Sequence, residues 1–134
     1  MMQGRLYLAM FRLTTWFLLF GTLLAVMHAT AIALYLYAYY WWFDIVMHFL
    51  GGMVVLLALG TLADLGRVAP RRVTAPAIAF GTLVFVMVAW EVFEYVVRVS
   101  RADNFALDTT IDLIVGFFGG LLGWLIIRNQ LTRV

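Results

Sequence analysis

Residues 41–62 read WWFDIVMHFLGGMVVLLALGTL, an apolar run in which the only ionisable side chains are Asp44 and His48. A helix of about 20 apolar residues is long enough to span the hydrocarbon core of a bilayer. Three other apolar runs have a similar length, at residues 13–37, 76–97 and 109–127. We therefore expect an all-α, polytopic membrane protein, in which residues 1–134 form one domain, a four-helix transmembrane bundle.

The composition supports this class. The chain is 66% hydrophobic and 12% charged, with a mean hydropathy of +1.02, and a soluble domain of this length could not bury so much apolar surface. It has no cysteine, which excludes disulfides and thiolate metal sites. The net charge of +2 is too small to suggest nucleic-acid binding. The partners expected first are membrane lipids.

The arginines predict the orientation of the chain. Two of the nine, Arg98 and Arg101, follow the third apolar run, and the other seven lie at the N-terminus, in the second link and at the C-terminus: Arg5, Arg12, Arg67, Arg71, Arg72, Arg128 and Arg133. By the positive-inside rule, both termini are expected in the cytoplasm. A cleavable signal peptide ending near residues 29–31 is the alternative for the first run. We disfavour it because residues 32–42 are still apolar and aromatic.

The predicted outer face carries aromatic side chains and two arginines. Tyrosines and tryptophans are concentrated in residues 35–42, as is typical of a membrane–water interface. Arg98 and Arg101 are candidate binding residues for an anion such as a lipid phosphate. In the simpler interpretation they only extend their charged ends into the headgroup region.

Ionisable residues gather at one depth of the predicted bundle. We estimate the depth of each residue from its distance along the helix, at about 1.5 Å per residue. Five of the seven carboxylates and both histidines are then expected near the outer face: His28, Asp44, His48, Glu91, Glu94, Asp108 and Asp112. Six of them form pairs three or four residues apart, so each pair shares one face of its helix. Ionisable groups inside a membrane are costly and usually functional. We expect them to form a shared site.

Glycines predict close contact between the helices that carry this site. Gly116, Gly119, Gly120 and Gly123 follow Asp112 in two overlapping small-xxx-small patterns, and the pair at residues 51–52 follows His48. Such patterns let helix backbones approach closely in membranes. Close packing would bring the polar pairs together.

A divalent cation is the simplest partner for these side chains. Iron, zinc and manganese all accept mixed carboxylate and imidazole ligands. Two alternatives stay open: a hydrogen-bonded network of protonated carboxylic acids, and a cationic ligand that enters from outside. The candidate metal ligands are His48, Glu91, Asp112, Asp44, Glu94 and Asp108, with His28 as a further candidate.

Several of these residues also have a purely structural interpretation. His28 is alone on its helix and can be a hydrogen-bonded core residue. Asp44 and Asp108 stand at predicted helix starts, where a carboxylate caps free backbone amides. Glu94 can form a surface pair with Arg98 four residues later. No such explanation is available for His48, Glu91 and Asp112.

Three motifs carry a family resemblance. They are Phe43-Asp44 with His48-Phe49 and Gly51-Gly52, then Trp90-Glu91-x-Phe93-Glu94, then Asp108-Thr109-x-x-Asp112. In this order they resemble the YjdF-type inner-membrane proteins of bacteria, which look related to the broader VanZ-like group. The resemblance implies a multi-pass protein of the bacterial inner membrane with an outward-facing polar site. VanZ-like proteins are associated with glycopeptide-antibiotic tolerance and the cell envelope.

Two classes of function fit the sequence, and whether the protein is an enzyme stays open. In the first, it binds a divalent metal and acts on or senses a lipid-linked cell-envelope molecule, since a bound cation can polarise an ester or phosphoryl oxygen. In the second, it is a non-catalytic structural or accessory subunit of a larger membrane complex. The polar cluster then serves only to hold the helices together.

Overall fold

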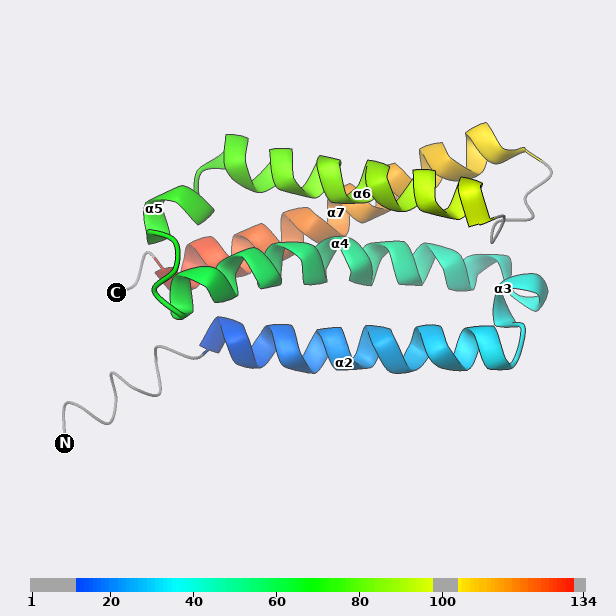
Figure 1. Cartoon of the computed structure of the whole chain (residues 1–134), viewed down its shortest axis with the longest axis horizontal. Coiled ribbons are helices and arrows are strands. Elements are labelled where there is room, and N and C mark those ends of the chain that lie inside the picture. The colour runs from blue at the N-terminus through cyan, green and yellow to red at the C-terminus, as the bar shows by residue number, and fades with distance from the viewer. Residues whose placement is uncertain (1–11, 98–103, 132–134) are drawn as a thin grey trace.

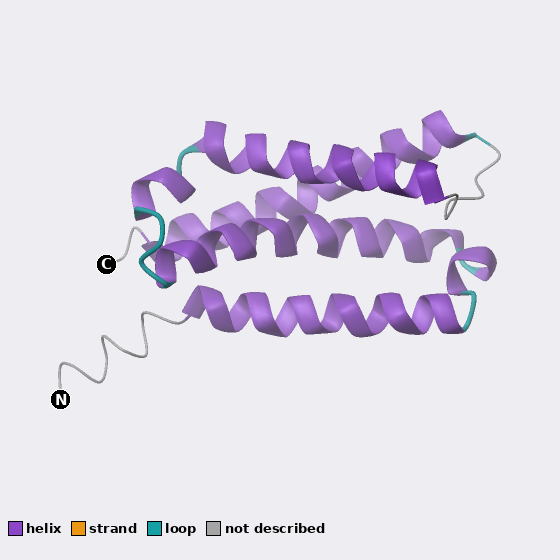
Figure 2. Cartoon of the chain, viewed as in Figure 1, coloured by secondary structure: helices purple, strands orange, loops and turns teal. Residues whose placement is uncertain are grey.

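The computed structural model describes residues 12–97 and 104–131, and every regular element in these residues is an α-helix (Figures 1 and 2). Four of the helices are long and apolar enough to cross a membrane by length and composition. The predicted all-α, four-helix architecture is therefore confirmed. The long helices are α2 (Arg12–Ala33), α4 (Trp41–Asp64), α6 (Pro76–Val97) and α7 (Phe105–Leu131), and the short ones are α3 (Leu36–Tyr39) and α5 (Pro70–Val73).

Helix α4 is the centre of the bundle. Its most extensive contact is with α7, and α2 packs against it as well, while α6 packs on α7 and α4. Figure 1 shows the start of α2 and the end of α7 at the same end of the bundle, and α3 at the opposite end. We call the end near α3 the distal end. Which side of the membrane it faces stays a prediction.

Glycines make the α4–α7 contact possible. A Cβ atom added to Gly52 would overlap the carbonyl oxygen of Gly116, and one added to Gly119 would overlap the carbonyl oxygen of Phe49. The two backbones are therefore in direct contact, as the small-residue patterns predicted. This contact sets α7 against the face of α4 that carries the polar residues.

The apolar core occupies the end of the bundle near the termini. Its fully buried side chains come from all four long helices and from α5: Leu13, Met53, Leu56, Leu57, Val73, Ala79, Leu83 and Ile127. Two polar contacts close this end. The backbone N–H and the hydroxyl of Thr14 donate to Asp64 Oδ2 at 2.9 and 3.1 Å, and Trp124 Nε1 donates to the Thr74 carbonyl at 3.1 Å. In the distal half a smaller apolar cluster, formed by Ala31, Phe43 and Met47, lies beside the ionisable residues.

The first helix is shorter than the sequence predicted. We expected it to continue to Tyr37, but α2 ends at Ala33 and the chain turns at Tyr35, which has a left-handed φ of 56°. Such a conformation costs a residue other than glycine about 1–2 kcal/mol. The turn brings the Tyr37 hydroxyl to 2.8 Å from His28 Nδ1. Apolar composition could not reveal this turn, because the residues on both sides of it are equally apolar.

Candidate functional site

His48 is the centre of the polar cluster and contacts carboxylates from three helices. Its Nε2 lies 3.5 Å from Asp44 Oδ1 on α4 and 3.8 Å from Asp112 Oδ2 on α7. Its Nδ1 lies 3.8 Å from Glu91 Oε1 on α6. The structure thus brings together residues that are up to 68 positions apart in the sequence, namely Asp44 and Asp112.

The cluster contains two groups of side chains with the composition of a metal site. Asp44, His48 and Asp112 form one, and His48, Glu91 and Glu94 form the other, with one ligand atom from each residue within 4.8 Å of the others. A neutral imidazole has one nitrogen with a free lone pair and one N–H. His48 can therefore bind an ion with one nitrogen while the other donates a hydrogen bond to a carboxylate.

Two of the three most buried carboxylates of the cluster accept a hydrogen bond from a neighbouring side chain. Glu91, Glu94 and Asp112 are 6%, 9% and 3% exposed. The Thr109 hydroxyl donates to Glu91 Oε2 at 2.9 Å, and Trp90 Nε1 donates to Glu94 Oε1 at 2.8 Å. The oxygen of Glu91 that faces His48 is the other one, Oε1. Each glutamate is thus fixed through one of its two oxygens.

His28 belongs to a neighbouring hydrogen-bonded pair and not to either metal-type group. Its Nδ1 lies 2.8 Å from the Tyr37 hydroxyl, and its ring lies edge-on to Trp90 with the centroids 6.0 Å apart. Burial, and then the charges of Asp44 and Glu94, raise the pKa of Tyr37 above its ordinary value. The hydroxyl is therefore held in its protonated form. We had placed Tyr37 only in the aromatic belt, and its position beside the cluster depends on the unpredicted turn.

The capping interpretation of two aspartates is wrong. The N-cap of α4 is Tyr40, and Asp44 lies in the first turn of the helix, where it faces His48. Helix α7 begins before Asp108, and Asn104 Oδ1 accepts a backbone N–H bond at its start, at 3.2 Å. Asp108 is in the first turn of α7 and is not a member of either metal-type group.

Charge is unevenly distributed along the bundle. The arginines of residues 12–97 and 104–131 lie at the end near the termini: Arg12, Arg67, Arg71, Arg72 and Arg128. Arg98 and Arg101 lie outside the described residues, so their anion-binding role and the Glu94–Arg98 pair stay predictions. In the described part of the chain, the distal cluster therefore has four carboxylates around one imidazole and no arginine beside it.

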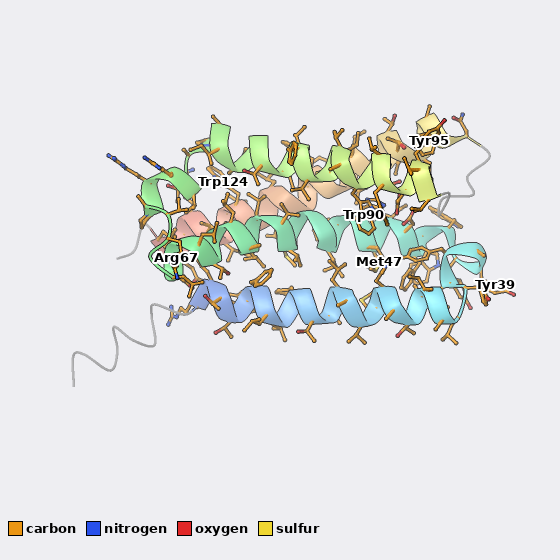
Figure 3. The ribbon with its side chains drawn as sticks, viewed as in Figure 1. Tyr39, Met47, Arg67, Trp90, Tyr95 and Trp124 are labelled. Carbon is orange, nitrogen blue, oxygen red and sulfur yellow. The ribbon has the colours of Figure 1, made fainter. Side chains whose placement is uncertain are left out.

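A cavity of about 330 Å³ adjoins the cluster. Residues of α2, α3, α4 and α6 line it, and most of them are apolar. Figure 3 labels two of the lining residues, Met47 and Trp90, in the distal half of the bundle. The polar lining residues are His28, Tyr37, Asp44, His48 and Glu94.

Four apolar helices around a half-buried histidine and its carboxylates define a small polytopic membrane protein. Residues 6–133 match the family described as Predicted membrane protein (DUF2238), so the chain belongs to that family. This is the family of the YjdF-type proteins, and the resemblance drawn from the motifs is confirmed to that extent. The link to the VanZ-like group stays a prediction. No curated protein and no solved structure matches the chain.

Proposed function

We propose that the protein binds one divalent cation through His48 Nδ1, Glu91 and Glu94, and that this ion serves a reaction or a sensing step on a lipid-linked molecule of the cell envelope. The observation that carries the proposal is the geometry of this group. Its three ligand-type atoms lie within 4.8 Å of one another. A four-coordinate ion bound by three protein ligands keeps one position open for water or substrate.

The hydrogen bonds around the two glutamates support this choice of ligands. Thr109 holds Glu91 and Trp90 holds Glu94, each through one carboxylate oxygen. Outer partners of this kind orient carboxylates that bind metals. On the other side of the ring, Nε2–H would point towards Asp44 and Asp112, which fixes the tautomer that leaves Nδ1 free for the ion.

Charge balance supports a divalent ion. Four ionised carboxylates around one imidazole are unfavourable in a membrane-spanning bundle, and each needs a proton or a positive partner. A divalent ion offsets two of these charges directly. Zinc, iron and manganese all accept one nitrogen and two carboxylate ligands.

The chemistry that such an ion would supply is Lewis acidity. It would polarise an ester or phosphoryl oxygen, or lower the pKa of a bound water. With both termini in the cytoplasm of a bacterial cell, the distal cluster would face the outer side of the inner membrane. Lipid-linked envelope molecules are exposed on that side, and this is the reason for proposing them as the substrate class.

Metal analysis of purified protein tests the proposal. Wild-type protein should carry stoichiometric zinc, iron or manganese, and Glu91→Gln and His48→Ala should carry much less. Asp64→Asn is the matched control, because this carboxylate also bonds to a threonine but lies at the opposite end of the bundle. Wild-type protein that holds no metal, and gains no thermal stability from added metal, would contradict the proposal. The cluster would then be a structural contact of an accessory membrane subunit.

A further inference from the structure

The cavity beside the cluster lies between two helices that are separated by α4. Figure 1 shows α2 and α6 on opposite sides of α4, and within the described residues α2 and α6 make no extensive contact with each other. The cavity is lined from both of them, by residues that include Leu24 and Ala25 on α2 and Val86 and Met87 on α6. Its volume of about 330 Å³ is at the lower end of the range for small-molecule sites, about 300–1,000 Å³.

The cavity has an apolar part and a polar end. Along α2 its lining runs from Gly21 to His28, which corresponds to about 10 Å of helix. Along α4 it runs from Val55 to Asp44, which corresponds to about 16 Å. In both helices the apolar lining lies towards the membrane interior and the ionisable side chain lies at the distal end. A ligand that fits must be amphiphilic, with a chain and a head.

Gly51 leaves room in the cavity for the hydrocarbon chain of such a ligand. It lines the cavity three residues after His48, and a Cβ atom added to it would meet no heavy atom within 4 Å. The wall residues Val86 and Trp90 are 37% and 40% exposed, so the cavity is reached past side chains on the outer surface of α6. In a membrane-spanning bundle that surface contacts lipid. The hydrocarbon chains of membrane lipids therefore lie next to the cavity.

We propose that the cavity binds the hydrocarbon chain of a membrane amphiphile with an uncharged oxygen head, such as an alcohol or an ester. The position of the head rests on the proposed metal function, because its oxygen would occupy the open position of the ion. With all four carboxylates ionised, one divalent ion leaves a net negative charge on Asp44, Glu91, Glu94 and Asp112. An anionic head, including a phosphoryl group, is therefore disfavoured, and of the ester and phosphoryl oxygens that the ion could polarise the ester is favoured. The Tyr37 hydroxyl lines the same polar end, and in the tautomer in which His28 Nδ1–H donates to it, its own O–H is available to donate to the head.

Photochemical labelling in lipid nanodiscs tests the site. The probe is a decan-1-ol derivative with a diazirine on its chain, and mass spectrometry of the peptides gives the labelled residues. Labels should fall on cavity-lining residues such as Leu24, Val55 and Met87. Unlabelled decan-1-ol should suppress labelling at a concentration at least about tenfold lower than decanoate. This ratio corresponds to a difference of about 1.4 kcal/mol in binding free energy. Equal competition by decanoate, or stronger competition by decylammonium, would overturn the assignment of the head.

Two glycine variants make the test specific. Gly51→Leu adds a side chain at the cavity wall, and its Cβ meets no heavy atom within 4 Å. Gly81→Leu adds the same side chain on α6, outside the lining, where the Cβ also meets no heavy atom within 4 Å. Replacing a helical glycine favours the helix in both variants, so neither should lose thermal stability. Labelling of the cavity should be lost in Gly51→Leu and kept in Gly81→Leu. Equal labelling of the two variants would refute the proposed site for the hydrocarbon chain, which we call the chain site.

Metal content is measured on the same samples, so that the two proposals fail separately. Protein that holds its metal but shows no label in the cavity would refute the chain site and leave the metal function. Protein without metal that still labels in the cavity would refute the metal function and the position of the head, and would keep the chain site.

Discussion

Thr109→Val is the most direct test of how the site is built. The change removes a hydroxyl that donates to Glu91 Oε2 at 2.9 Å, while the side chain keeps almost the same shape and Glu91 keeps its charge. Loss of an outer partner of this kind weakens metal binding about 10- to 100-fold. This corresponds to about 1.4–2.8 kcal/mol of binding free energy.

Thr110→Val is the matched control for this variant. The next residue on the same helix donates its hydroxyl to the Ala106 carbonyl at 2.6 Å and is exposed. Metal affinity is measured by competition with a coloured chelator, on protein in detergent. The control should bind metal like wild type. If Thr109→Val binds as tightly as wild type, or if both variants lose affinity equally, Thr109 does not position a metal ligand.

Three further predictions concern pH and packing. Metal binding should weaken as the pH falls, because the imidazole and carboxylate ligands must be deprotonated, and metal titrations between neutral and acidic pH check this. Gly119→Leu should lower the thermal unfolding midpoint, since its side chain would overlap the Phe49 backbone and overpacking costs about 1–3 kcal/mol, whereas Gly81→Leu should not. The raised pKa of Tyr37 means that its stabilising effect is present below the ordinary tyrosine pKa of about 10 and is lost as the pH rises above it. Tyr37→Phe should therefore reduce the loss of thermal stability at alkaline pH, and exposed Tyr39→Phe should not.

The spans could be predicted from the sequence because the bilayer sets their length and composition. The third run was predicted at residues 76–97 and is found as Pro76–Val97, and the second was predicted at 41–62 and is found as Trp41–Asp64. The end of the first run was wrong because the turn at Tyr35 lies between equally apolar residues. The start of the fourth was set four residues too late, because Asn104 forms the cap and not Asp108.

The positions of the cluster residues could also be predicted, because three- and four-residue spacing fixes the face of a helix. The side chains that form hydrogen bonds with the cluster residues could not be predicted. Thr109 and Glu91 are 18 residues apart and lie on different helices, so their hydrogen bond depends on how α6 and α7 pack. The same is true of Tyr37, which reaches the cluster through α3. The cavity follows from the separation of α2 and α6, for which the sequence has no periodic signal.

The contact between His48 and Asp44 within α4 has a consequence for the biogenesis of the protein. If helices enter the bilayer in chain order, α4 enters before α6 and α7, which carry Glu91 and Asp112. At that stage His48 already has a hydrogen-bonding partner one turn away on its own helix. The segment that enters the bilayer therefore has two polar side chains that can form a hydrogen bond with each other. The contact within α4 thus lowers the cost of placing Asp44 and His48 in the bilayer. Helices α6 and α7 then add Glu91 and Asp112 to the cluster.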